Sequence, residues 1–126
     1  MPELPEVETI KRSLGPLIEN KAIESVEVYF GGIVKYPEPA VFRTLLKNKL
    51  IKEIRRRGKY LLFELNGGYT LVIHLRMTGQ LTVSPPGAPL AKHTHLVFRL
   101  SDGRELRFVD IRKFGLVYLV ETGDWA

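Results

Sequence analysis

The stretch YLLFELNGGYTLVIHL, residues 60–75, decides the fold. Two runs rich in aromatic and β-branched residues flank Asn66-Gly67-Gly68, which has the composition of a tight hairpin loop. Each run is apolar at successive positions, as in Leu61-Leu62-Phe63 and Leu71-Val72-Ile73, so we expect both faces of each strand to be covered. This pattern favours two packed sheets over one exposed sheet.

Similar runs extend outward from this hairpin in both directions. Ser101-Asp102-Gly103 predicts a second tight turn, whereas residues 84–90, with three prolines, predict a long irregular connection. Antiparallel hairpins at this spacing are typical of a sandwich or a barrel, and the apolar faces favour a two-layer antiparallel β-sandwich. Beyond the first hairpin, the predicted strands cover residues 22–29, 50–56, 80–83, 95–100, 104–110 and 115–120.

Two flanking helices complete the predicted fold, which is mainly β. Residues 6–14 carry Val7, Ile10 and Leu14 at helical spacing, and Gly15-Pro16 predicts the end of that helix. A second short helix is predicted over residues 40–48, with an apolar face of Val41, Leu45 and Leu46.

The composition indicates one compact domain, since the chain has 126 residues, 44% of them hydrophobic and 26% charged. No apolar run approaches the roughly 20 residues that a membrane helix needs. The start MPELPEVE is acidic and rich in proline, unlike a secretory signal, so we expect a cytoplasmic location. The chain has no cysteine, which excludes disulfides and cysteine-built zinc sites within it.

Positive charge is concentrated in one window. The net charge is +5, and residues 47–60 hold seven lysines and arginines against the single acid Glu53. A solvated charged face explains such a window. The alternative is a nucleic-acid backbone, because clustered cations release counterions from phosphates.

Phosphate-binding loops, nucleotide-binding glycine fingerprints and zinc-protease motifs are missing from the sequence. His93 and His95 are two residues apart and would face the same side of a strand, where His74 could join them as a metal ligand. No further ligand pattern supports that site. We therefore predict no metal, and interpret these histidines as polar strand residues or phosphate contacts.

The N-terminus allows two interpretations. Proline and the acids Glu3, Glu6 and Glu8 suit the start of a helix, where acids complement the dipole. If Met1 is removed, however, Pro2 presents a secondary amine that can attack a sugar carbon and form an iminium ion. Glu3 beside it could shuttle protons. If Met1 is retained, the Pro2 nitrogen is an amide and is not nucleophilic.

Five motifs span almost the whole chain: PELPEVET (2–9), RRGKYLL (56–62), HLRMTG (74–79), KHTH (92–95) and DIRKFG (110–115). Each is weak alone, but in this order they resemble the formamidopyrimidine-DNA glycosylases. The resemblance implies a base-excision repair enzyme that extrudes an oxidised purine, such as 8-oxoguanine or a formamidopyrimidine, from the duplex. It cleaves the glycosidic bond and then nicks the abasic strand by β,δ-elimination.

The resemblance also assigns roles to residues. Pro2 would be the Schiff-base nucleophile, Glu3 the acid that protonates the sugar ring oxygen, and Lys59 the proton donor in β-elimination and a phosphate contact. Glu6 would lie close to the extruded base. The remaining DNA contacts implied are the duplex-probing residues Met77, Arg112 and Phe114, with His93 and, as a weaker candidate, His74 on backbone phosphates.

Ordinary core positions are the alternative for Met77 and Phe114, although the neighbouring glycines Gly79 and Gly115 favour strand ends that project outward. The sister branch of endonuclease VIII-type enzymes acts on oxidised pyrimidines. Leu4 and the probing residues favour the purine branch over it. Two further alternatives stay open, namely a non-catalytic DNA-damage-binding module on the same fold and a purely structural sandwich.

We expect residues 1–126 to be the N-terminal catalytic domain of such an enzyme. Complete family members continue into a helix–two-turn–helix domain and a four-cysteine zinc finger, which this chain lacks. Accordingly, we predict no cofactor in this chain and zinc only in that finger. The expected partner is double-stranded DNA with oxidised bases or abasic sites, bound near the bacterial nucleoid by a monomer. The domain alone should bind this DNA more weakly than a complete enzyme.

Overall fold

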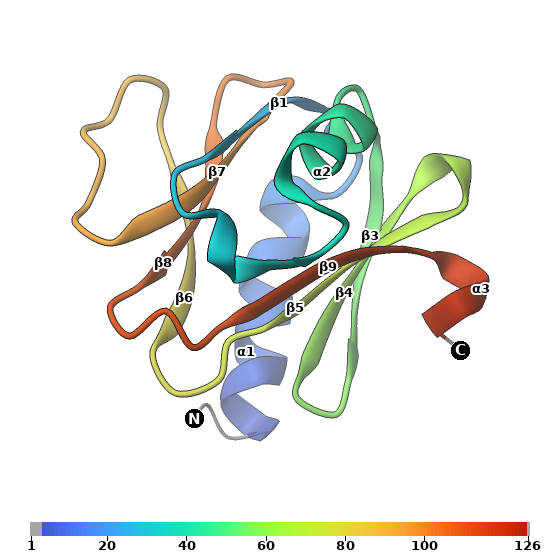
Figure 1. The fold of residues 1–126 in the computed structure, drawn as a ribbon, viewed down its shortest axis with the longest axis horizontal. Helices are drawn as coiled ribbons and strands as arrows, with labels where there is room; N and C mark the ends of the chain where they lie inside the picture. Colours follow the sequence, from blue (N-terminus) through green and yellow to red (C-terminus); the bar gives the residue numbers. More distant parts are fainter. Residues whose placement is uncertain (1–3, 126) are drawn as a thin grey trace.

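The computed structural model describes residues 4–125 as two β-sheets packed face to face, with helices at their sides (Figure 1). This confirms the predicted two-layer sandwich. The strands are β1 (Ile23–Val28), β2 (Val34–Tyr36), β3 (Ile51–Arg57), β4 (Tyr60–Leu65), β5 (Tyr69–His74), β6 (Gly79–Ser84), β7 (Thr94–Leu100), β8 (Glu105–Asp110) and β9 (Leu116–Glu121). The helices are α1 (Leu4–Ile18), α2 (Pro39–Leu46) and α3 (Thr122–Trp125), with 3₁₀ turns at Gly31–Ile33 and Asn66–Gly68.

One sheet has the strand order β1-β7-β8-β6 and the other the order β2-β9-β5-β4-β3. All pairs are antiparallel except β2 with β9, which is parallel. The inward faces of both sheets form one core, in which Phe63, Phe98 and Phe108 are fully buried. Each phenylalanine removes some 150–250 Å² from water, so these rings supply much of the force that holds the layers together.

The two long helices cover the open sides of the sandwich. α2 packs on β1 and β2, which are the edge strands on one side, and α1 packs on β3, β4 and β6 on the other. In Figure 1, α1 runs between β6 and β4 across the gap that the two sheets leave. Both helices therefore shield edge strands and bury an apolar face in the same step.

The prediction that Gly15-Pro16 ends the first helix is wrong, because α1 continues through both residues to Ile18. Pro16 lies on the exposed side of the last turn, where its ring faces solvent, although the proline removes one N–H from the helix. Ile18 is completely buried, and the Glu19 carboxylate accepts the Ile54 N–H at 2.9 Å. Packing of the last turn against β3 thus outweighs the helix-breaking sequence.

Two further details differ from prediction. Helix α2 buries Phe42 and Leu46, whereas Val41 is 41% exposed and does not belong to the packed face. Strand β2 is missing from the prediction, because it is only three residues long and ends just before Pro37. Its pairing with β9 also depends on residues more than 80 positions away. Both differences arise from tertiary contacts that sequence periodicity does not contain.

Among the helices of the described residues, none is long and apolar enough to cross a membrane.

Candidate functional site

One end of the sandwich gathers the loops that carry the predicted site residues. We call this the loop end; it comprises the β3–β4 turn, the β5–β6 loop, the β8–β9 loop, the residues before β7 and the first turn of α1. Strand register brings these segments together, since Tyr60 pairs with His74, His74 with Leu116, and Gly79 with Asp110. In Figure 1 the β3–β4 turn, the β5–β6 and β8–β9 loops and the start of α1 lie toward the lower side of the molecule, and the connection into β7 lies at its left side.

Pro2 and Glu3, the predicted nucleophile and its acidic neighbour, lie outside the described residues. Their nearest described neighbours in sequence begin α1, where Glu6 is exposed. Glu6 and Ile10 line one side of a groove of about 390 Å³, and Met77 and Thr78 line the other with the first residues of β6. The groove therefore brings the residue predicted to lie near the extruded base together with a predicted probing residue.

The apolar residues of the two longer loops face solvent. Met77 is 55% exposed and Phe114 is 45% exposed, so neither belongs to the core, which was the alternative interpretation of both. Ile111 in the same loop as Phe114 is 67% exposed. The Arg112 guanidinium lies 6.0 Å from the centre of the Phe114 ring. Exposed apolar side chains that gather on neighbouring loops mark a candidate contact surface.

The β8–β9 loop is held from below by Asp110, which is completely buried. Its Oδ1 accepts hydrogen bonds from the Thr78 hydroxyl and from the Arg112 N–H, the latter at 3.2 Å. Its Oδ2 accepts the Gly115 N–H at 2.8 Å. Lys113 adds a second anchor, with its ammonium 4.4 Å from the centre of the Phe30 ring. The loop is consequently fixed at both ends and in the middle.

His93 and His95 do not face the same side, so that part of the sequence interpretation is wrong. β7 begins only at Thr94, and its register shifts between Thr94 and Leu96, which breaks the alternation. His93 is exposed and has a positive φ of 65°, whereas His95 is buried and its Nε2 lies 2.6 Å from the Asp110 carbonyl oxygen. A carbonyl only accepts, so Nε2 of His95 carries the proton.

His74 is 8% exposed and its Nδ1 accepts the Arg76 N–H at 3.0 Å. Its ring stands edge-on to Tyr60 at 4.7 Å. Burial lowers the pKa of His74 below its ordinary value, and the charges of Arg76 and Lys59 lower it further. A neutral imidazole holding the backbone of Arg76 is the role this geometry shows, and the phosphate contact of His74 stays a prediction.

Lys59 occupies the β3–β4 turn beside Gly58, whose positive φ of 59° allows the chain to reverse there. Part of the basic window next to it is neutralised within the protein. Arg56 donates to Glu8 of α1 at 2.8 Å, and Arg55 forms an ion pair with Glu64. Those two arginines thus tie β3 to its neighbours, and the window is not one uninterrupted cationic surface.

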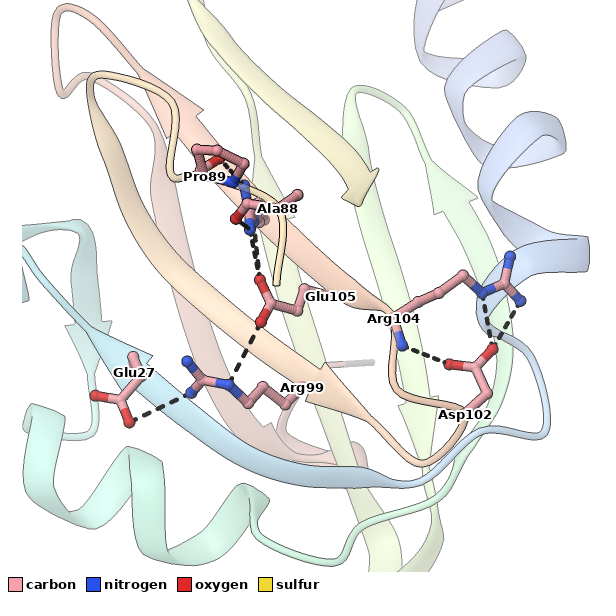
Figure 2. Close-up of polar contacts among 8 residues, drawn as sticks. Glu27, Ala88, Pro89, Arg99, Asp102, Arg104 and Glu105 are labelled. Carbon is pink, nitrogen blue, oxygen red and sulfur yellow. Dashed lines mark hydrogen bonds and ion pairs between the residues drawn. The ribbon is translucent and has the colours of Figure 1, made fainter. Parts of the chain in front are cut away.

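The long connection from β6 to β7 folds over the outer face of β8. Figure 2 shows the polar contacts beneath it, in which Arg99 joins Glu27 and Glu105. Glu105 also pairs at 2.7 Å with Arg107, which is 4% exposed and donates to the carbonyls of Ala88 and Pro89 at 2.7 and 2.9 Å. A buried guanidinium with this set of acceptors pins the connection that leads to His93.

No cluster of three or more histidine, aspartate or glutamate side chains suited to a metal occurs within residues 4–125.

Sequence reasoning missed Asp110 and Thr78, whose hydrogen bond joins two loops of the site. Both stood inside recognised motifs, but their contact joins residues 32 positions apart. The sequence signal for such a loop anchor is an aspartate at the end of a predicted strand, followed five residues later by a glycine.

The family model for the formamidopyrimidine-DNA glycosylase N-terminal domain matches residues 1–117. The chain belongs to this family. The resemblance carried by the five motifs is thereby confirmed.

Relatives named formamidopyrimidine-DNA glycosylase include that of Moorella thermoacetica, 56% identical over 124 residues, and that of Lactiplantibacillus plantarum, 48% identical over 124 residues. Each match covers 98% of this chain and 45% of the relative, so the chain spans less than half the length of these relatives.

Solved structures of the Lactococcus lactis formamidopyrimidine-DNA glycosylase have the same fold. One, in complex with DNA containing an oxidised pyrimidine, superposes with a TM-score of 0.93 at 38% identity and covers 98% of this chain and 46% of its own. Another holds DNA containing a formamidopyrimidine-deoxyguanosine and superposes with a TM-score of 0.93 at 37% identity, with the same coverage.

Proposed function

We propose that this chain is the catalytic domain of a base-excision repair glycosylase and abasic-site lyase that acts on oxidised purines in duplex DNA. The observation that carries the proposal is the loop end, where Met77 shares a groove with Glu6, Arg112 lies over Phe114, and strand register brings the turn of Lys59 to the same end. The Lactococcus lactis relative bound to formamidopyrimidine DNA supports the substrate class. Cytoplasmic DNA of a bacterium is the proposed setting.

The proposed chemistry begins at Pro2, once Met1 has been removed. The neutral secondary amine attacks C1′ of the damaged nucleotide, the glycosidic bond breaks, and the base leaves with a proton. Glu3 protonates the ring oxygen, so the sugar opens and an iminium ion links C1′ to the protein. Loss of a proton from C2′ expels the 3′ phosphate, and a second elimination expels the 5′ phosphate.

Lys59 is the proposed proton donor in the first elimination and a contact to the flanking phosphates. The ordinary pKa of a terminal amine is about 8, so a fraction of the Pro2 amine is neutral at physiological pH. Glu6 lines the groove beside Met77, which suits a residue next to the extruded base. Since Pro2 and Glu3 lie outside the described residues, these steps rest on the family motif and on the neighbours that are described.

The proposed probing residues replace the extruded base in the stack. Extrusion costs a few kcal/mol of stacking and pairing. Met77 and Phe114 are apolar and exposed, so they can fill the gap and hold the duplex bent. Arg112 can donate to the orphaned partner base, and exposed His93 can donate to a phosphate.

The complete protein of this family is about twice the length of this chain. We propose that a helix–two-turn–helix domain and a zinc finger complete the DNA site in such a protein, with the only cofactor, zinc, in that finger. The domain alone is expected to bind damaged duplex more weakly than a complete relative.

Borohydride trapping tests the proposal. The chain, shown by intact mass to lack Met1, is incubated with abasic-site DNA and borohydride, which reduces the iminium ion to a stable covalent adduct. We expect an adduct with the unmodified terminus, none when two residues are added before Pro2, and an adduct with slower strand cleavage in Lys59→Ala. An adduct that still forms in the extended chain would assign the nucleophile to another amine. The absence of any adduct would contradict the lyase activity and favour the non-catalytic damage-binding module.

Oxidised pyrimidines are a second candidate substrate. The relative of known structure is also seen bound to DNA with such a lesion. A panel of duplexes carrying 8-oxoguanine, formamidopyrimidine or an oxidised pyrimidine, each opposite its usual partner, discriminates the two candidates by the rate of base release.

A further inference from the structure

Asp110 connects three segments of the loop end through every polar group it has. Its backbone N–H donates to the His93 carbonyl at 3.0 Å, and its own carbonyl accepts from His95 Nε2. Its carboxylate accepts from Thr78 of the β5–β6 loop and from the backbone of Arg112 and Gly115 in the β8–β9 loop. One buried residue therefore touches the loops of all four exposed DNA-contact candidates, Met77, His93, Arg112 and Phe114.

The chemistry of these contacts makes the arrangement rigid. A buried carboxylate is costly to desolvate unless donors surround it, and here a hydroxyl and two backbone N–H groups converge on its two oxygens. Moving either loop would leave the carboxylate short of a donor. Each loop is thus held in place by the same charge.

Glycines allow the close backbone packing of the two loops around Asp110. A Cβ on Gly115 would stand 2.3 Å from Phe108 Cζ and 3.0 Å from Asp110 Oδ2. A Cβ on Gly79, which pairs with Asp110, would stand 2.5 Å from the Leu75 carbonyl oxygen. The β8–β9 loop therefore approaches Asp110 more closely than a side chain at Gly115 would permit, and the β5–β6 loop is itself too tight for a side chain at Gly79.

We propose that Asp110 is a positioning residue that sets the β5–β6 and β8–β9 loops in one register, so that Met77, Arg112 and Phe114 enter a damaged duplex as a unit. The inference rests on the proposed function, because it assigns these three side chains to the duplex. Asp110 itself is buried beneath them and does not touch DNA.

The Thr78–Asp110 hydrogen bond is the informative one to break. It joins the two loops, whereas the Arg112 and Gly115 bonds lie within one loop. Thr78→Val is isosteric and removes the hydroxyl, while Thr78→Ser keeps it. Thr44→Val is the matched control, because it removes a threonine hydroxyl that bonds the Ala40 carbonyl on α2, away from the loop end.

The experiment measures the affinity of each variant for two duplexes at one salt concentration, one undamaged and one with a stable abasic-site analogue opposite cytosine. Melting temperature is recorded in parallel. We expect Thr78→Val to bind the undamaged duplex as the parent chain does, since phosphate contacts are unchanged, and to lose about tenfold of its preference for the damaged duplex. Thr78→Ser and Thr44→Val should keep that preference.

The outcomes separate this inference from the proposed function. A parent chain with no preference for the damaged duplex contradicts the proposed function, and the inference falls with it. A parent chain that prefers the damaged duplex, with the preference kept within twofold in Thr78→Val, overturns the inference alone. Equal loss on both duplexes in step with a lower melting temperature also overturns it, since that is the signature of a merely structural bond.

Asp110→Asn gives an independent readout inside the protein. An amide offers one oxygen in place of two and turns an N–H₂ group toward a donor. We expect amide hydrogen exchange at Gly115 and Arg112 to quicken at least about tenfold, while exchange at the Asn66–Gly68 turn stays unchanged. Unchanged exchange at Gly115 in a folded variant would show that the carboxylate does not hold the loop.

Discussion

The two ends of the sandwich differ in where the side chains that accept backbone N–H groups lie. At the turn end, which holds Asn66–Gly68 and residues 101–103, exposed side chains accept the backbone N–H groups. Ser101 accepts from Ala22, and Asn66 accepts from Leu50, each at 3.0 Å. At the loop end the acceptor is the fully buried Asp110, and the side chains left outside are apolar.

The position of the hydrogen-bond acceptors decides which side chains each end exposes to solvent. At the turn end, polar side chains at the surface accept the N–H groups of neighbouring segments. At the loop end the polar groups lie beneath the surface, which frees Met77, Ile111 and Phe114 to face outward. Holding exposed apolar side chains in place before binding lowers the entropy cost of binding, which is why we propose the loop end as the end that contacts DNA.

The largest expected effect compares two phenylalanines. Phe98 is fully buried and packs edge-on against Phe42, whereas Phe114 is 45% exposed. Phe98→Ala should lower the free energy of unfolding by about 3–5 kcal/mol. Phe114→Ala should change it by no more than about 0.5 kcal/mol and should weaken binding to damaged duplex. Urea unfolding and a duplex titration measure both, and equal destabilisation would contradict the distinction between core and loop end.

Gly115→Ala should come next, because its Cβ would overlap the Phe108 ring, which is buried. We expect a loss of about 1–3 kcal/mol in the free energy of unfolding, as in overpacked cores. Gly123→Ala is the control, since a Cβ there meets nothing within 4 Å. A Gly115→Ala variant with an unchanged free energy of unfolding would show that the β8–β9 loop is free to move away from Phe108 and Asp110.

Asn66→Ala tests the turn end. It removes the acceptor of the Leu50 N–H and should cost about 1 kcal/mol of unfolding free energy, with no change in the affinity for damaged duplex. Asn66→Asp retains an oxygen at that position and should be closer to the parent chain. Weaker DNA binding in Asn66→Ala, at a temperature where the variant is folded, would place the turn end in the interface.

The smallest effect concerns acid. Arg56 holds the pKa of Glu8 at about 2, below its ordinary value of 4.5, and Arg12 and Lys11 lower it as well. A depressed pKa in the folded state stabilises the protein above the unfolded value, and this contribution is lost as pH falls toward 2. The stability difference between the parent chain and Glu8→Gln should therefore shrink from pH 5 to pH 2 in urea unfolding. Parallel curves over that range would rule out the Glu8–Arg56 pair as the cause.

Much of this fold follows from local sequence. The runs on either side of Asn66-Gly67-Gly68 predict the central hairpin and its burial on both faces, because a continuous apolar run and a turn signal are local properties. The end of α1 was mispredicted, because burial of Ile18 overrides Gly15-Pro16. The face of α2 was also mispredicted at Val41, since a short helix gives few positions from which to fix its orientation.

The site was predictable as a set of motifs but not as a geometry. Met77, Arg112 and Phe114 are predicted from the motifs as contact residues, but the buried Asp110 that supports their loops is not. The contact between Thr78 and Asp110 exists only once β6 pairs with β8 in the observed register. Burial of Asp110 depends on the same pairing, and no periodicity in the sequence reports it.

The most direct test of the account is to titrate the isotopically labelled 126-residue chain with a duplex containing a stable abasic-site analogue, followed by NMR. The account predicts shifts concentrated at Met77, Arg112 and Phe114 and in the first turn of α1, with the 66–68 and 101–103 turns unchanged. Shifts centred on those turns, or no shifts at the loop end at saturating duplex, would contradict it.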